Sequence, residues 1–247
     1  MIVMNTKNYS EFRLALIIPF YNEEKRINAG SFTNFADQNK DILLILVDDG
    51  SRDNTKNILT SICSVSATNS EAIYLEKNVG KGNAIRTGME KAILYQIPFI
   101  GYMDADLSAP FEEILRLHQY IQTSDDLSVF GSRLKKLGSD IKRSLFRHIT
   151  GRMVATITDS RFNIGCYDTQ CSAKIFTIES LKPAITEPFF TRWFFDIELI
   201  LRIRKKFERF KVQEIPLNKW EHKAGSKITI FSAFRVIKEI YILFSKY

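Results

Sequence analysis

The chain has 247 residues, of which 45% are hydrophobic, so it is long enough to bury a full core. Its formal net charge of +7 favours an anionic partner, which includes phosphate-bearing substrates, anionic lipids and nucleic acids. No stretch reaches the ~18 consecutive apolar residues of a membrane-spanning helix, and residues 1–13 lack the apolar core of a signal peptide, so we expect a cytoplasmic protein. The three cysteines form no CxxC pair, which excludes a disulfide framework and a cysteine zinc site.

The first 110 residues alternate short apolar runs with amphipathic stretches, a pattern typical of βαβ units around a largely parallel sheet. The predicted buried strands are residues 14–19, 42–47, 72–75 and 99–103. The helices predicted between them are residues 23–35, 53–63 and 82–95. We therefore expect an α/β fold whose ligands bind beyond the carboxyl ends of the strands.

The rest of the chain continues the mixed pattern. Further helices are predicted at residues 111–122, 141–159 and 196–207, and further strands at residues 127–131, 171–177 and 211–217. Residues 230–247 place their apolar residues on one helical face and basic residues elsewhere, which is typical of an amphipathic helix. We expect one domain over residues 1–229, followed by a helix that packs on this domain or contacts a membrane or a partner.

Acidic residues follow three of the four predicted N-terminal strands. These strand ends supply Glu23, Asp48, Asp49, Asp104 and Asp106. Because the carboxyl ends of parallel strands meet at one edge, the five carboxylates should gather there, and their repulsion calls for a cation among them. The DxD spacing of Asp104 and Asp106 suits a hard divalent ion, with a substrate diphosphate in the remaining coordination positions.

A glycine-flanked turn at residues 78–84 leads into a predicted helix. Free backbone N–H groups at a helix start, together with Lys81, are suited to meet a phosphate, although a plain helix-start turn explains the pattern equally well. The spacing fits neither a P-loop nor a dinucleotide-binding fingerprint. The three histidines are widely separated, with no HExxH spacing, and are not predicted to bind metal.

Four segments in combination resemble a known family. They are IIPFYNEE at 17–24, VDDGSRDNT at 47–55, NVGKGNAIRTGM at 78–89 and MDADLSAP at 103–110. In this order they resemble the nucleotide-sugar-binding half of family 2 inverting glycosyltransferases, whose GT-A fold is a Rossmann-like mixed sheet flanked by helices. Later segments resemble the branch that makes dolichyl or polyprenyl phosphate glucose and mannose. They are GSR at 131–133, DTQCSAKIF at 168–176, RWFFDIELI at 192–200 and WEHKAGSKI at 220–228.

The resemblance implies a nucleotide diphosphate sugar as donor, UDP-glucose or GDP-mannose, and Mg²⁺ or Mn²⁺ as cofactor. The residues implied for the donor are Pro19, Tyr21, Glu23, Asp48, Asp49, Lys81 and Asp104. The metal ligands would be Asp104 and Asp106. The residues implied for catalysis are Asp106, Arg133, Asp196 and Lys227, and those for the acceptor are Arg143, Gln170, Lys174 and Arg192.

The acceptor class can be approached from acid–base chemistry. A sugar hydroxyl has a pKa far above 7 and needs a general base, for which Asp196 is the candidate. A phosphate monoester, with a second pKa of about 6, is mostly dianionic already and needs only cations. Cations are dense after the fifth predicted strand, at Arg133, Lys135, Lys136, Lys142, Arg143, Arg147 and Arg152. We therefore expect a polyprenyl phosphate acceptor at the inner face of the membrane, although a solvated basic face has the same signature.

Three alternatives stay open at this point. One is a transferase of the same fold that glycosylates a hydroxyl of a polysaccharide or a lipid-linked oligosaccharide. Another is a sugar nucleotidyltransferase, although the glycine-rich arginine-lysine loop of that class is absent near the N-terminus. The last is a nucleic-acid-binding module, which the five predicted rim acids oppose because they would repel a polyanion. The oligomeric state is not predicted.

Overall fold

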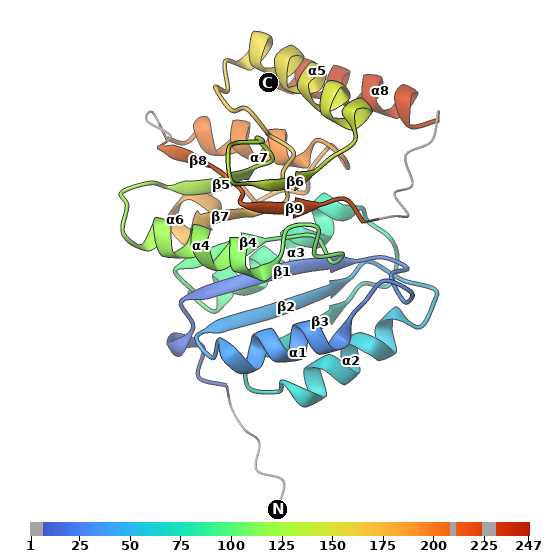
Figure 1. Cartoon of the computed structure of the whole chain (residues 1–247), viewed down its shortest axis with the longest axis vertical. Helices are drawn as coiled ribbons and strands as arrows, with labels where there is room; N and C mark the ends of the chain where they lie inside the picture. The colour runs from blue at the N-terminus through green and yellow to red at the C-terminus, as the bar shows by residue number, and fades with distance from the viewer. Residues whose placement is uncertain (1–6, 208–210, 224–230) are drawn as a thin grey trace, which may run out of the picture.

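A seven-stranded mixed sheet forms the centre of the molecule, in a computed structural model that describes residues 7–207, 211–223 and 231–247 (Figure 1). Its strands in spatial order are β3 (Ser70–Tyr74), β2 (Ile42–Asp48), β1 (Leu14–Phe20), β4 (Phe99–Tyr102), β7 (Lys174–Thr177), β5 (Ser128–Ser132) and β8 (Val212–Pro216). A separate parallel ribbon joins β6 (Asp140–Lys142) to β9 (Lys219–Glu221).

Every strand of the large sheet except β7 runs in one direction. β1 pairs in parallel with β2 and β4, and β5 pairs in parallel with β8. β7 is antiparallel to both of its neighbours, β4 and β5. The carboxyl ends of six strands and the amino end of β7 therefore lie along the same edge, which we call the rim.

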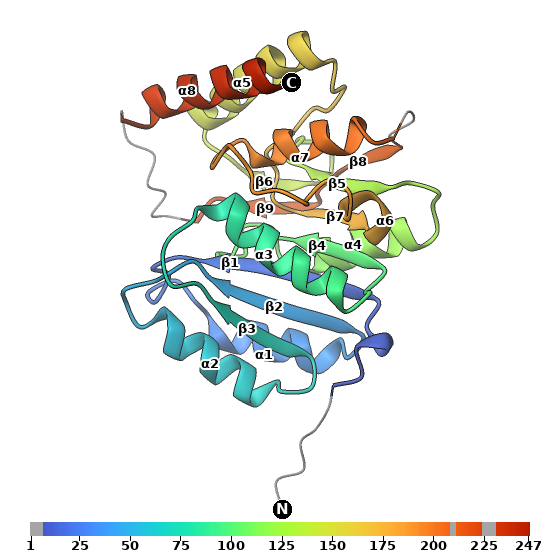
Figure 2. The same ribbon diagram turned by 180° about the vertical axis from the view of Figure 1, so that it is seen from behind.

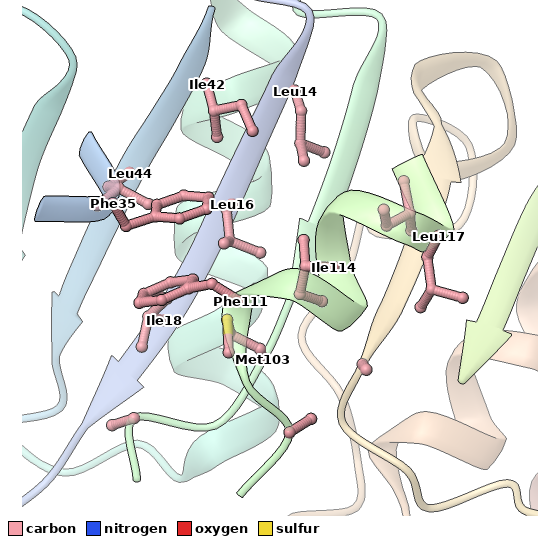
Figure 3. Packing of buried hydrophobic residues seen from close by; sticks show 14 of the residues in the cluster. Leu14, Leu16, Ile18, Phe35, Ile42, Leu44, Met103, Phe111, Ile114 and Leu117 are labelled. Atoms are coloured by element: carbon pink, nitrogen blue, oxygen red, sulfur yellow. The ribbon is translucent and has the colours of Figure 1, made fainter. Parts of the chain in front are cut away.

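Helices cover both faces of this sheet (Figures 1 and 2). In chain order, after a short 3₁₀ turn, Tyr9–Glu11, the helices of the described residues are α1 (Ala29–Gln38), α2 (Thr55–Val65), α3 (Lys81–Leu94), α4 (Phe111–Gln122), α5 (Leu145–Phe162), α6 (Ile178–Leu181), α7 (Phe195–Arg204) and α8 (Phe231–Lys246). The helices α5 and α8 are not among those that cover the sheet. On β1, alternate residues point to opposite faces. Leu16 packs with Phe35 of α1 and Ile114 of α4, as Figure 3 shows, whereas Ile17 belongs to the cluster on the α3 and α7 side.

Two predicted helix starts are wrong. The helix predicted at residues 23–35 begins only at Ala29, because residues 23–28 form a turn in which Glu23 O accepts hydrogen bonds from Arg26 N and Ile27 N. Asn28 then caps the helix through Ser31 N. The helix predicted at residues 141–159 begins at Leu145, because Asp140–Lys142 pairs with β9 instead. Both stretches have helical spacing, but backbone groups in each of them form hydrogen bonds with a segment distant in the chain instead.

The helices α5 and α8 lie side by side beyond α7, away from the large sheet, as both views show (Figures 1 and 2). Leu243 of α8 is fully buried against Phe194, Ile197 and Leu201, and Phe162 of α5 meets Phe244 edge to face. The C-terminal amphipathic helix is thus confirmed, and its inner face packs on the domain. The domain boundary predicted at residue 229 stays a prediction, because residues 224–230 lie outside the described part. Among the described residues, no helix combines the length and the apolarity needed to cross a bilayer.

Candidate active site

The acidic strand ends lie together at the rim. Phe20 pairs with Asp48, and Asp49 N donates to Phe20 O at 2.8 Å, so the loops after β1 and β2 leave the sheet side by side. Met103 N donates to Ile17 O at 3.2 Å, which brings the end of β4 to the same edge. The predicted donor residues Pro19, Tyr21, Glu23, Asp48, Asp49, Lys81 and Asp104 all belong to the strand ends, loops and helix start of this edge.

Two cations neutralise the DxD carboxylates. Lys81 Nζ lies 2.5 Å from Asp104 Oδ1, and Arg26 Nη2 lies 2.8 Å from Asp106 Oδ2 while its other nitrogen is 3.1 Å from Glu23. Burial lowers the pKa of Lys81, but Asp104 and then Asp196 outweigh it and raise that pKa above its usual value. Burial raises the pKa of Asp104, and Lys81 more than reverses this effect. Both groups are therefore charged at neutral pH.

The glycine-flanked turn is fastened by Asp49. Asp49 accepts hydrogen bonds from Val79 N at 2.7 Å, Gly80 N at 3.0 Å and Asn78 Nδ2 at 2.8 Å. Burial raises the pKa of this carboxyl, and the two backbone donors act in the opposite direction. The prediction that free N–H groups of this turn meet a phosphate is wrong for residues 79 and 80, because a buried carboxylate already holds them.

Close approach explains the two glycines of this turn. Gly80 has a φ of +94°, and a Cβ there would lie 2.5 Å from Arg192 Nε. A Cβ on Gly82 would lie 2.5 Å from Cβ of Phe195, at the start of α7. Arg192, which also donates to Asn78 Oδ1, is therefore part of the wall formed by this turn rather than a neighbour of the basic run that follows β5.

Asp196 and Lys174 form a buried ion pair beneath the rim. Lys174 is fully buried, and its Nζ lies 2.9 Å from Asp196 Oδ1. The Tyr102 hydroxyl donates to the same oxygen, and burial followed by Asp196 raises the pKa of Tyr102 well above its usual value. The ammonium of Lys174 also donates to Cys171 O. The assignment of Lys174 to the acceptor is wrong in this structure, because its charge faces the interior.

Arg133 is held in a fixed orientation at the end of β5. Its Nε and Nη2 each lie 2.7 Å from an oxygen of Asp168, and its guanidinium stands 5.4 Å from the ring centre of Trp220. Glu214 in turn accepts from Asp168 N at 2.7 Å. Arg143 is close enough that Arg133, after burial, lowers its pKa. Two predicted cations thus meet at the end of β5, beside the loop that carries half-buried Gln170.

Replacing Asp168 by Asn should reduce the free energy of unfolding by about 2 kcal/mol at pH 7, because Arg133 would lose its charged partner. Burial raises the pKa of Asp168, but Arg133 dominates and holds it far below its usual value. A depressed pKa stabilises the fold above the unfolded pKa of about 4 and loses that contribution as the pH falls further.

Denaturant unfolding between pH 7 and pH 3 would measure this difference, with exposed Asp125→Asn as the control. The difference in the free energy of unfolding between the wild type and Asp168→Asn should become smaller below about pH 4. A gap that stays constant over the whole range would contradict the assigned ion pair.

A hollow of about 340 Å³ opens beside Asp106. Its lining residues are Arg26, Asn28, Ser31, Ala105, Asp106, Leu107 and Lys223. Glu221 N donates to Ser108 O at 2.9 Å, so the strand β9 and the residues after it border this hollow. Lys227, predicted to be catalytic, lies outside the described residues, so its role stays a prediction.

The donor set at the rim fits a hard divalent cation. Asp104 and Asp106 lie two residues apart in the loop after β4, and both carboxylates are partly exposed, so each has oxygens available to a hard cation. Within the described ranges, no group of three His, Cys, Asp or Glu side chains is arranged to hold a metal ion by itself. A bound ion would therefore need further ligands from water or from a bound molecule.

Three residues of the site escaped the sequence interpretation. Arg26 falls in a predicted helix, although its place just after the motif at 17–24 is a signal of proximity to the rim. Tyr102, the last residue of a buried strand, looked like core. Asp168 opens the motif at 168–176, and this place in the motif is the available signal for it.

The family model described as Glycosyl transferase family 2 matches residues 15–182, more than half of the chain. The chain belongs to this family of glycosyltransferases. A dolichyl-phosphate beta-glucosyltransferase from Dictyostelium discoideum is 30% identical, in an alignment that covers 94% of this chain and 73% of that protein. The human dolichyl-phosphate beta-glucosyltransferase is 29% identical over 89% of this chain and 70% of its own.

Solved structures share the fold at lower identity. Glucosyl-3-phosphoglycerate synthase from Mycobacterium tuberculosis, in complex with Mn²⁺, UDP and glucosyl-3-phosphoglycerate, matches with a TM-score of 0.71 and 15% identity, over 96% of this chain and 81% of that chain. The complex of that enzyme with Mn²⁺ and UDP-glucose matches with a TM-score of 0.69 and 17% identity, over 96% and 80% of the two chains. The predicted GT-A fold is thereby confirmed.

Proposed function

We propose that this glycosyltransferase moves glucose from UDP-glucose to a polyprenyl phosphate at the cytoplasmic face of a membrane, with inversion at the anomeric carbon. The relatives that cover most of the chain are named dolichyl-phosphate beta-glucosyltransferases, which supports both the sugar and the acceptor class. The fold is that of an enzyme solved with UDP-glucose and Mn²⁺, which supports the nucleotide and a divalent cation.

In this proposal the loops of the rim bind the donor. Tyr21 and Glu23 after β1, with Asp48 and Asp49 after β2, border the nucleoside, and Asp104 and Asp106 face the ribose and the diphosphate. Lys81, which pairs with Asp104, is near enough to share its charge with a phosphate oxygen. A bound Mg²⁺ or Mn²⁺ on Asp104 and Asp106 would stabilise the departing diphosphate as a Lewis acid.

The observation that favours a phosphate acceptor is the buried, ion-paired environment of Asp196. A hydroxyl acceptor needs a general base, and the predicted candidate is buried, ion-paired with Lys174 and hydrogen-bonded by Tyr102. These contacts occupy Oδ1, and the nearly complete burial of the side chain leaves little of this carboxylate open to an acceptor hydroxyl. A phosphate dianion needs no base, and Arg133 and Arg143 at the end of β5 supply positive charge to bind it.

The reaction is then a single displacement. An oxygen of the acceptor phosphate forms a bond to the anomeric carbon, and the bond from that carbon to the diphosphate oxygen breaks, with its electron pair leaving on UDP. No proton has to move. Arg133, oriented by Asp168, reduces the repulsion between the two anionic groups.

Incubation with labelled UDP-glucose, Mn²⁺ and a polyprenyl phosphate should transfer the label into the organic phase, and removal of the metal by a chelator should abolish this transfer. GDP-mannose and a free polyprenol serve as the comparisons. Transfer to polyprenol but not to its phosphate would contradict the phosphate acceptor and support a hydroxyl acceptor. Label from GDP-mannose alone would contradict the proposed donor.

A further inference from the structure

A glycine lies inside α5, at a place where helices usually avoid one. Gly151 stands well within the ends of this helix, and its φ is not positive, so the backbone gives no reason for a glycine. Glycine weakens a helix interior relative to alanine, because it loses more conformational freedom on folding. The reason is a close approach. A Cβ at residue 151 would overlap Nη2 of Arg143, and it would lie 3.5 Å from Cζ and 3.9 Å from Nη1 of the same guanidinium.

The part of α5 around Gly151 is fastened to the loop that orients Arg133. The residue after this glycine, Arg152, donates from Nη1 to Tyr167 O at 2.6 Å, and its guanidinium stands 4.0 Å from the centre of the Tyr167 ring. Tyr167 is followed directly by Asp168, whose carboxylate holds Arg133. The surface that Gly151 offers to a neighbouring side chain is therefore fixed relative to Arg133.

Two guanidiniums are held near each other as a result. Burial is the largest effect that lowers the pKa of Arg143, and the positive charge of Arg133 comes next, while Asp168 acts in the opposite direction. Asp168 already gives both of its carboxylate oxygens to Arg133. Like charges repel, and an anion bound by both of them would relieve this repulsion. A phosphate monoester suits such a pair, because it offers several oxygens to two guanidiniums.

We propose that Gly151 is a positioning residue for the acceptor of this transferase. Because it has no side chain, the guanidinium of Arg143 rests against α5, and from there Arg143 and Arg133 bind oxygens of one phosphate group. The inference rests on the proposed function for its choice of a phosphate monoester as the anion. The three nearest neighbours of a Cβ on Gly151 all belong to the flexible end of Arg143, so a methyl group there would move the guanidinium rather than the backbone.

Replacing Gly151 by Ala should raise the KM for a polyprenyl phosphate about tenfold and leave the KM for UDP-glucose unchanged, because the displaced guanidinium loses a charge-assisted contact with the acceptor. The midpoint of thermal unfolding should equal or exceed that of the wild type, since alanine favours the helix. A role in stability alone would give the opposite result, a lower midpoint with both KM values unchanged. Gly30→Ala is the matched control and should change neither KM. Gly30 is exposed in α1, and a Cβ there would lie 3.5 Å from Asn28 Oδ1, an ordinary contact.

A double variant shows whether Gly151 acts through Arg143. The single change Arg143→Gln should raise the KM for the polyprenyl phosphate by about tenfold or more. Adding Gly151→Ala to Arg143→Gln should raise this KM no further, because no guanidinium is left to displace. If the two effects multiply in the double variant instead, Gly151 acts independently of Arg143 and the proposal is overturned.

Calorimetry of geranyl phosphate binding, with geraniol as the uncharged comparison, separates this inference from the proposed function. The wild type should bind geranyl phosphate and not geraniol, and Gly151→Ala should bind geranyl phosphate about tenfold more weakly. A wild type that does not bind geranyl phosphate, or a Gly151→Ala protein that binds it as tightly as the wild type, overturns the inference. If binding follows the expected order but no polyprenyl phosphate accepts glucose, the proposed function fails while the role of Gly151 stands. If glucose reaches a polyprenyl phosphate with the same KM in both proteins, the inference fails while the proposed function stands.

Discussion

Replacing Asp106 by Asn should lower the rate of sugar transfer by roughly 10³-fold, with the fold retained. Asp106 is partly exposed, and its carboxylate lies 2.8 Å from Arg26. Because the side chain is not buried in the core, its replacement by the similar-sized Asn should leave the fold intact. The substitution removes one of two carboxylates available to a divalent ion and leaves Arg26 its contact with Glu23. The loss should therefore fall on metal-dependent steps.

The measurement is turnover of labelled UDP-glucose across a Mn²⁺ titration, combined with calorimetry of UDP binding with and without the metal. Asp106→Asn should lose the part of UDP binding that depends on Mn²⁺. Asp37→Asn is the control, because Asp37 forms an exposed pair with Lys40 far from the rim. An Asp106→Asn protein with wild-type metal dependence would show that the rim carboxylates serve another purpose.

Replacing Lys174 by Met should reduce the free energy of unfolding by about 4 kcal/mol, because Asp196 would keep a buried charge without its partner. Lys174 is fully buried and Asp196 nearly so, and the Nζ to Oδ1 distance is 2.9 Å. Tyr102 alone cannot replace the lost positive charge. Denaturant unfolding at pH 7 measures the effect.

The double variant Lys174→Met with Asp196→Asn removes both charges and should recover most of the lost stability. It also separates the role of Asp196 as the ion-pair partner of Lys174 from its predicted role as a general base. The single change Asp196→Asn confounds them, because it strands the Lys174 charge and lowers stability whether or not Asp196 is a base. A stable double variant that still transfers sugar to a polyprenyl phosphate would support the base-free reaction, and a stable but inactive one would contradict it.

The local pattern of the chain was sufficient for most of the architecture. The apolar runs at β1, β2 and β4 were placed to within one residue of their observed ends. Apolar runs of that length, separated by amphipathic stretches, leave few alternatives to buried parallel strands. The gathering of Glu23, Asp48, Asp49, Asp104 and Asp106 at one rim followed from strand direction alone.

Helix starts were harder because they depend on partners distant in the chain. Residues 23–28 have helical spacing, yet Glu23 N donates to Thr55 Oγ1 at 2.9 Å and Glu24 N donates to Asp53. In the same way, Asp140–Lys142 pairs with β9 as a strand, so α5 begins later than the spacing predicts. A sequence pattern describes which face is apolar but not which other segment will take a backbone hydrogen bond.

The sequence by itself determined the α/β fold, the order of the rim loops and the acidic and basic character of the site, because each of these follows from burial periodicity and strand direction. Only the tertiary structure decided which charges pair: Arg26 with Asp106, Lys174 with Asp196 and Arg133 with Asp168. Electrostatic partners are chosen by distance in space and by burial, and residues far apart in the chain carry no local sign of either. The same reason separates the buried face of α5 from its exposed face, since only the packing of this helix reveals which of its apolar side chains are left exposed.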